Sequence, residues 1–165
     1  GIGGQGIISL SKKIAEILTG DPNITNLVLS ESRGVSQREG MVTALIRFVY
    51  SKNPGSEKTN ELMQVQLAPM PYDGIADIFI GLELLESIRN LKYLSKRGIA
   101  LINFNEIYPK NVKQEDITKI KNTTSQFNQI ISNHYPDAKI VKIERSDYES
   151  NLEILKKLAP EIFSG

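Results

Sequence analysis

Cysteine is missing from this sequence, and histidine occurs only once, at His134. A chain without cysteine has no disulfide, no catalytic thiol and no thiolate ligands for a zinc ion or an iron–sulfur cluster. A single histidine leaves no His-rich metal site, and no triad context accompanies it. Because His134 follows an apolar helical pattern, we interpret it as complementing the C-terminal end of a helix dipole. The sequence therefore predicts no catalytic and no metal-ligating residue in this chain.

An excess of charge of either sign is also absent. The 20 Lys and Arg residues nearly balance the 19 Asp and Glu residues, which leaves a net charge of +1. This balance argues against a basic nucleic-acid-binding surface and against an acidic tail. No apolar run approaches the ~20 residues that cross a bilayer, and no signal-peptide pattern is seen. We therefore expect a cytoplasmic protein without nucleic-acid or membrane partners.

The 165 residues, 40% of them hydrophobic, leave room for one domain, which we take as residues 1–165. Short apolar strands alternate with amphipathic helices, a rhythm typical of a mostly parallel sheet with helices on both faces. We therefore predict a Rossmann-like, three-layer α/β/α fold. Strands are expected near 27–29, 41–50, 62–67, 75–80, 99–102 and 138–143, helices near 7–18, 84–94, 114–133 and 152–158, and a polar turn at 30–40.

A glycine-rich loop opens the sequence, with glycines at positions 1, 3, 4 and 6. Their spacing matches G-x-G-x-x-G, and a helical pattern follows at once. Exposed amides before a helix N-terminus suit a phosphate or another anion, so Gly3, Gly4, Gln5 and Gly6 are candidate binding residues. The alternative is that these glycines only permit a tight turn. Because such a loop normally follows a strand, we expect the first strand to be missing from the sequence.

Four further side chains are candidates for binding. Glu31 is placed as the acidic residue of a dinucleotide fold that contacts a ribose. Arg33 and Arg38 flank Gly34 and suit a phosphate, a carboxylate or an acidic patch on a partner, unless they form only weak ion pairs in a solvated turn. Asp77 interrupts an apolar strand, so it either anchors the glycine loop or lies at an exposed strand edge.

These motifs together resemble one enzyme family. The opening Gly1-Ile2-Gly3-Gly4-Gln5-Gly6 is similar to the GxGGQG start of the gamma subunit, or gamma domain, of 2-oxoacid:ferredoxin oxidoreductases. The segments 30–40 and 74–77 resemble that family's S-E-x-x-G-x-x-x-R-G-G and G-x-A-D motifs. Residues 83–89 look most like the branch named indolepyruvate oxidoreductase beta subunit. The resemblance covers about the first 110 residues and departs from the family pattern at Glu39, at the glycine pair before residues 99–102 and beyond Lys110.

The resemblance implies a subunit of a larger enzyme. Enzymes of this family decarboxylate a 2-oxo acid on thiamine diphosphate, pass electrons through iron–sulfur clusters to ferredoxin, and release an acyl-CoA. Thiamine diphosphate, magnesium and the clusters are then expected on thiamine-binding and ferredoxin-like partner subunits, with CoA as cosubstrate. Dimerisation is a further possibility, and Arg38→Ala is expected to weaken assembly. Two alternatives stay open: a stand-alone nucleotide-binding module that uses Glu31 on a ribose, and a scaffold without a ligand site.

Overall fold

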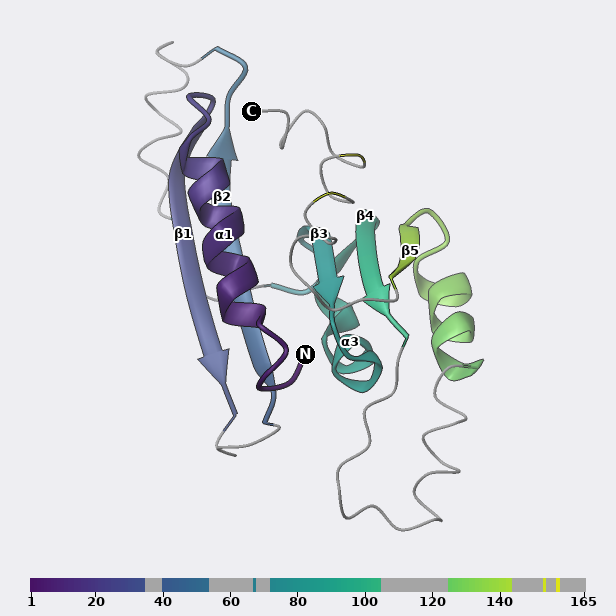
Figure 1. Cartoon of the computed structure of the whole chain (residues 1–165). Coiled ribbons are helices and arrows are strands. Elements are labelled where there is room, and N and C mark those ends of the chain that lie inside the picture. Colours follow the sequence, from purple (N-terminus) through teal and green to yellow (C-terminus); the bar gives the residue numbers. More distant parts are fainter. Residues whose placement is uncertain are drawn as a thin grey trace.

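The structure is a computed structural model that describes residues 1–34, 40–53, 67, 72–104, 125–143, 153 and 157. Its strands form two groups that lie next to each other (Figure 1). One group is an antiparallel hairpin covered by a helix, and the other is a parallel sheet. In chain order the elements are α1 (Ile7–Thr19), β1 (Ile24–Arg33), β2 (Val42–Tyr50), β3 (Ala76–Gly81), α3 (Leu84–Asn90), the 3-10 turn η1 (Leu91–Tyr93), β4 (Leu94–Asn103), helical residues 125–134 and β5 (Lys139–Ile143).

The parallel sheet has the strand order β3-β4-β5. Successive side chains of a strand point to opposite faces, and β4 follows this rule. Ile99 and Leu101 belong to an apolar cluster that includes Leu10 and Ile14 of α1. Ala100 and Ile102 belong to a second cluster, with Leu84 of α3 and with Phe127 and Ile130 of the helix at 125–134. Helices therefore cover both faces of the sheet, which confirms the predicted α/β class with its three layers.

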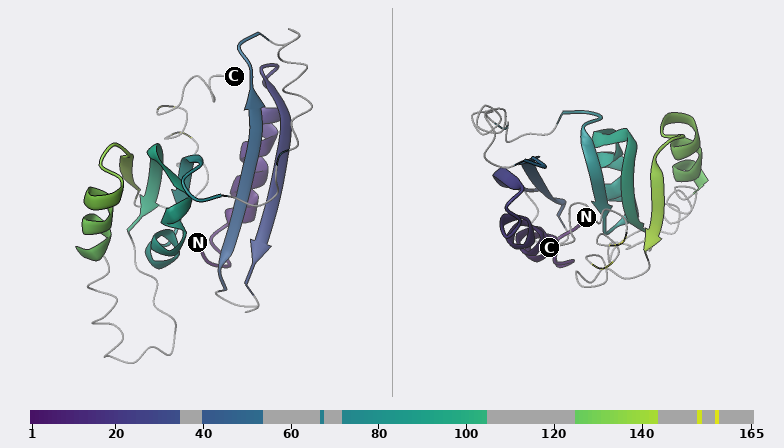
Figure 2. Two further views of the ribbon diagram at one scale, coloured as in Figure 1. Left: turned by 180° about the vertical axis from the view of Figure 1, so that it is seen from behind. Right: turned by 90° about the horizontal axis from the view of Figure 1, so that it is seen from above.

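Helix α1 forms because its apolar residues recur at helical spacing. Leu10, Ile14 and Leu18 are buried, while the lysines at 12 and 13 are exposed. The helix ends at Gly20, whose N–H donates to the carbonyl of Ile17 at 3.1 Å. Its buried face lies against the β1–β2 hairpin, as the two views of Figure 2 also show. This packing sets the start of α1 beside the end of the hairpin where Arg33 pairs with Val42.

The hairpin differs from the sequence-based prediction. We expected residues 30–40 to form a polar turn, but β1 continues to Arg33 and pairs with β2 in antiparallel register. Ser30, Glu31 and Ser32 lie opposite Leu45, Ala44 and Thr43. Cross-strand pairing with an apolar strand outweighs the low strand propensity of these polar residues, because β-propensity depends on what the strand packs against.

The second difference lies after α3. We expected a helix that includes Leu94 and ends at Gly98, but the helix ends at Asn90 and tightens into η1, and β4 begins at Leu94. Leu94 is buried and pairs with Ala76 of β3, so a long-range strand contact replaces the local helical pattern. The strands predicted at 41–50, 75–80 and 138–143 are confirmed. The predictions for 62–67, for 114–124 and for most of 152–158 lie outside the described residues.

Candidate functional site at the glycine-rich loop

The glycine-rich loop leads directly into α1. Gly4 and Gly6 have φ angles of +91° and +74°, in the left-handed region that L side chains rarely adopt. Gly6 is the residue before the first helical turn, and no side chain caps that turn. The first turn also contains no acidic residue. The amides at the start of α1 thus lie beside bare glycine backbone, at the positive end of the helix dipole.

The loop is joined by backbone hydrogen bonds to the end of the hairpin where Arg33 pairs with Val42. The N–H of Gly3 donates to the carbonyl of Gly40 at 2.9 Å, and Ile2 forms an antiparallel bridge with Met41. On the other strand, the N–H of Gly34 donates to the carbonyl of Met41 at 2.8 Å. Residues far apart in the sequence therefore surround the start of α1.

A hollow of about 800 Å³ lies between the loop, the first turn of α1 and the hairpin end. This volume is within the range of sites for small ligands and cofactors. Arg33 is the charged residue of its lining, and its side chain is 68% exposed. The described residues that line the hollow are Ile2, Gly3, Gly4, Gly6, Ile7, Ile8, Ser9, Arg33, Gly34, Gly40, Met41 and Val42.

Gln5 does not line this hollow, although the sequence motif grouped it with the glycines. Its side-chain amide is used inside the protein: Oε1 accepts from the N–H of Ile2 at 2.9 Å, and Nε2 donates to the carbonyl of Leu82 at 2.8 Å. Leu82 directly follows β3 and is buried. Gln5 therefore connects the loop to the end of the parallel sheet, and it acts on the hollow by positioning the loop.

The other candidate residues lie in different places. Glu31 is on β1, where its carboxylate lies 3.8 Å from the Arg33 guanidinium, and it does not line the hollow. Asp77 lies on β3 with an exposed side chain, and it is not part of the lining. Arg38 lies outside the described residues. The structure thus brings together Gly3, Gly4, Gly6 and Arg33, while their binding role stays a prediction.

Sequence reasoning named Arg33 but missed the other residues on the hairpin side of the hollow. Gly40, Met41 and Val42 reach the glycine loop only through long-range pairing, which no local pattern reveals. Ser9 is an exposed residue of the first turn of α1 and also lines the hollow. A possible signal for these residues was the resemblance of the segment 30–40 to the same family as the loop.

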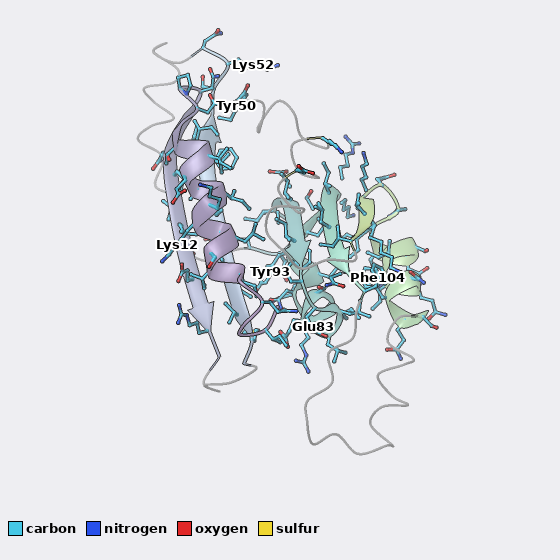
Figure 3. All side chains as sticks on the ribbon, viewed as in Figure 1. Lys12, Tyr50, Lys52, Glu83, Tyr93 and Phe104 are labelled. Atoms are coloured by element: carbon cyan, nitrogen blue, oxygen red, sulfur yellow. The ribbon has the colours of Figure 1, made fainter. Side chains whose placement is uncertain are left out.

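A buried pair of carboxylates lies at the start of α3, where Figure 3 labels Glu83. Glu83 caps the helix, because its carboxylate accepts the N–H groups of Leu85 at 3.0 Å and Glu86 at 2.8 Å. Glu86 is also buried, and one of its oxygens pairs with Arg89. Both carboxylates lie at the start of the helix, where they complement its dipole. His134 is the last helical residue of the segment 125–134, and it is exposed.

The described part of the chain contains no group of three or more His, Cys, Asp and Glu side chains that could hold a metal ion. Within the same residues, no helix has both the length and the apolar character needed to span a membrane. Among the residues that the structure describes, the candidate site is therefore a hollow lined by glycine residues and by one cationic residue, Arg33.

Comparison with known proteins identifies the family of this chain. The model of the family "Pyruvate ferredoxin/flavodoxin oxidoreductase" matches residues 1–144. Three curated relatives are named indolepyruvate oxidoreductase subunit IorB. The protein of Archaeoglobus fulgidus is 31% identical over 112 residues, and that of Methanothermobacter thermautotrophicus is 34% identical over 112 residues. The protein of Thermococcus kodakarensis is 32% identical over 114 residues.

These alignments cover 68% of this chain and 47–48% of each relative. The chain thus spans about half the length of the curated relatives it matches. The matched region includes the glycine-rich loop, the hairpin and the parallel sheet. By sequence and by its α/β architecture, the chain belongs to the pyruvate ferredoxin/flavodoxin oxidoreductase family.

Proposed function

We propose that this chain is a subunit of a 2-oxoacid:ferredoxin oxidoreductase whose substrate is an aryl-pyruvate of the indolepyruvate type. Such an enzyme decarboxylates the 2-oxo acid, passes the electrons through iron–sulfur clusters to ferredoxin, and releases an acyl-CoA. The observation that carries the proposal is the family match over residues 1–144, together with relatives named as indolepyruvate oxidoreductase subunits. A cytoplasmic location is part of the proposal.

The residues of this chain do not fit the cofactors of the reaction. A sequence without cysteine has no thiolates for an iron–sulfur cluster. The described residues also lack a cluster of carboxylates and histidines that suits a divalent cation. We therefore derive no reaction step through these groups here. In the proposed complex, thiamine diphosphate, magnesium and the clusters are held by the thiamine-binding and ferredoxin-like partner subunits.

The proposal gives the glycine-rich loop a binding role. Gly3, Gly4 and Gly6 line a hollow at the uncapped start of α1, and Arg33 is among the residues that line it from the hairpin. Backbone N–H groups, a helix dipole and a guanidinium all favour an anion. We propose that the hollow holds a phosphate-bearing group, and CoA is the phosphate-bearing cosubstrate of the reaction.

The stand-alone nucleotide-binding module is less well supported. It needs Glu31 to contact a ribose beside the glycine loop. Glu31 instead lies on β1, 3.8 Å from the Arg33 guanidinium and outside the lining of the hollow. The geometry therefore favours a site for an anion over a site that selects a ribose.

Phosphate binding tests the proposed site. Titration with inorganic phosphate, and separately with CoA, is expected to shift the amide NMR signals of Ile7, Ile8 and Ser9. Arg33→Ala is expected to weaken binding by about 1 kcal/mol, or roughly fivefold, because an exposed charge contributes modestly. Arg97→Ala is the matched control, since it removes the same charge from an exposed position on β4. Unchanged amide signals at high phosphate would remove the anion role.

Reconstitution tests the proposed enzyme. Ferredoxin reduction that depends on indolepyruvate and CoA is measured with the partner subunits, with and without this chain. We expect full activity only when the chain is present, and lower activity when pyruvate replaces indolepyruvate. Equal activity without the chain would refute the subunit role, and a preference for pyruvate would refute the aryl-pyruvate assignment.

A further inference from the structure

Strand β1 has an outer edge that faces away from the rest of its hairpin. It is the strand of the hairpin that lies farther from the parallel sheet, as Figure 1 and both views of Figure 2 show. Within the described part of the chain, β1 pairs with β2 and with no other strand. An open edge presents backbone N–H and C=O groups that act as a template for pairing with another chain.

The hydrogen bonds to β2 identify the residues that face this edge. The N–H of Gly34 donates to the carbonyl of Met41 across the hairpin, so the backbone of Gly34 points toward β2. Because this direction alternates along an antiparallel strand, Arg33, Glu31 and Leu29 present their N–H and C=O groups outward. Glu31 is an exposed residue although its side chain is only 26% exposed, so part of its exposed surface is backbone.

The edge is regular only over its C-terminal part. The register with β2 shifts between Thr25 and Val28, and Asn26 in this interval has a φ angle of +53°. Such a bulge bends a strand and interrupts its ladder. From Val28 to Arg33 the register is continuous. The usable edge is therefore short, which favours a weak contact over open-ended stacking of strands.

Two outward residues of this edge carry opposite charges. Glu31 and Arg33 lie two positions apart, and their charged groups are 3.8 Å from each other. In an antiparallel pair of two copies with Ser32 opposite Ser32, each Glu31 lies opposite Arg33 of the second copy. Opposite charges directly across such a pair are stabilising. The edge is thus complementary to itself, and the small side chain of Ser32 leaves room at the centre.

The neighbouring registers do not have this complementarity. The outward residues of both copies must face each other, so the register changes in steps of two residues. One step in one direction places Glu31 opposite Glu31, and one step in the other direction places Arg33 opposite Arg33. Like charges directly across a strand pair are destabilising. The charges therefore select the register that is centred on Ser32.

We propose that the outer edge of β1 is a self-association surface, and that its partner is a second copy of this chain. The two hairpins then form one continuous sheet in the order β2-β1-β1-β2, about a two-fold axis at Ser32. Both α1 helices lie on the same face of this sheet, and Arg33, which lines the hollow, lies beside the axis in each copy. The inference goes beyond the proposed function and does not depend on it.

Charge reversal tests the surface by analytical ultracentrifugation of the purified full chain. Glu31→Lys and Arg33→Glu each place like charges opposite each other, so each variant should dimerise ~10-fold more weakly than the unmodified chain. An equal mixture of the two variants places opposite charges across both positions, so a mixed dimer should form as readily as the unmodified one. Arg97→Glu is the matched control, because it reverses the same charge at an exposed position on β4, and it should leave dimerisation unchanged.

Amide hydrogen exchange locates the contact. The amides of Glu31 and Arg33 should exchange more slowly as the protein concentration rises, because they gain hydrogen bonds in the dimer. The amide of Thr43 on β2 is the internal reference, since Thr43 pairs with Ser32 inside one copy. Its exchange should not depend on concentration.

Three results would overturn the proposal. The first is a chain that stays monomeric up to ~1 mM, a concentration at which even a weak dimer is populated. The second is a mixture of the two variants that stays monomeric although circular dichroism shows both to be folded. The third is a dimer in which the exchange of Glu31 and Arg33 does not change with concentration, because the contact then lies on another surface.

Discussion

At the scale of single residues, backbone conformation decides which amino acids fit the glycine-rich loop more than side-chain chemistry does. Gly4 and Gly6 are the two positions of the loop with left-handed φ angles. No atom lies near a Cβ placed on either of them, so strain alone and not a clash opposes a side chain there. The exposed backbone is thus a direct consequence of the amino acid that the conformation requires.

Replacement of Gly6 tests this reading. Gly6→Ala is expected to lower the free energy of unfolding by about 1 kcal/mol, because an L residue is strained at positive φ. Gly6→Asn is the matched variant, and it should lose less because asparagine adopts the left-handed region more readily. Urea unfolding followed by circular dichroism measures both. Equal stability of the alanine variant and the unmodified protein would contradict the assigned conformation.

Gln5 illustrates what a motif does not reveal at this scale. The GxGGQG pattern correctly predicts a helix start with exposed glycine backbone. It does not predict that both ends of the Gln5 amide are used by Ile2 and Leu82, because Leu82 is distant in the sequence. Likewise, the residue type of Asp77 left two interpretations open: its side chain is exposed, but β3 begins at Ala76, so Asp77 lies within the strand and not at its edge.

At the scale of elements, the predictable segments are those whose burial follows a local period. Helix α1 shows a clear helical period, and β3 is a short apolar run ended by a glycine. The C-terminal part of β1 and the first half of β4 were not predictable in this way. Residues 30–33 and 94–97 are rich in polar or charged residues, and their strand conformation depends on partners elsewhere in the chain. The contribution of Met41 and Val42 to the hollow could not be predicted for the same reason.

The start of α3 depends on Glu83. Its carboxylate accepts two helix N–H groups, and its carbonyl accepts the Ser87 hydroxyl at 2.5 Å. Glu83→Ala is therefore expected to destabilise the protein by about 1–2 kcal/mol, the usual effect of a lost N-cap. Glu83→Gln keeps one acceptor oxygen and should therefore lose less stability than Glu83→Ala. Glu16→Ala, on the exposed face of α1, is the control and should change stability little. A Glu83→Ala variant as stable as this control would refute the capping role.

The helix at 125–134 is joined to η1 by Tyr135, whose hydroxyl donates to the carbonyl of Leu91 at 3.0 Å. Tyr135→Phe is expected to cost about 1 kcal/mol of stability, the usual contribution of one hydrogen bond. Burial raises the pKa of Tyr135, and the negative charge of Asp73 adds to this effect. The stabilisation by this hydrogen bond is therefore fully present below about pH 10, the pKa of an unfolded tyrosine. It is lost as the pH rises through the higher pKa of Tyr135 in the folded protein.

Unfolding curves at several pH values measure the difference in free energy of unfolding between the unmodified protein and the Tyr135→Phe variant. We expect it to be constant at neutral pH and to shrink in strong alkali. Tyr72→Phe serves as the control, because Tyr72 is 65% exposed. A Tyr135→Phe variant without loss at neutral pH would show that the contact with Leu91 contributes nothing.

At the scale of the whole molecule, the chain is an α/β unit of an oxidoreductase family without thiolate ligands of its own. The absence of cysteine and the order of the motifs predict both properties from the sequence alone. The three layers then place the glycine-rich loop at the junction of α1 and the hairpin end. We propose that the chain depends on partner subunits, because this dependence explains how a family member without cysteine takes part in iron–sulfur chemistry.

Co-purification from the native source tests this claim most directly. The chain, tagged at its C-terminus, is isolated at native expression, and the eluate is assayed for thiamine diphosphate by thiochrome fluorescence and for protein-bound iron. We predict that both elute with the chain in a fixed ratio, on partner subunits identified by mass spectrometry. Recovery of the folded chain alone, without thiamine diphosphate or iron, would contradict the account.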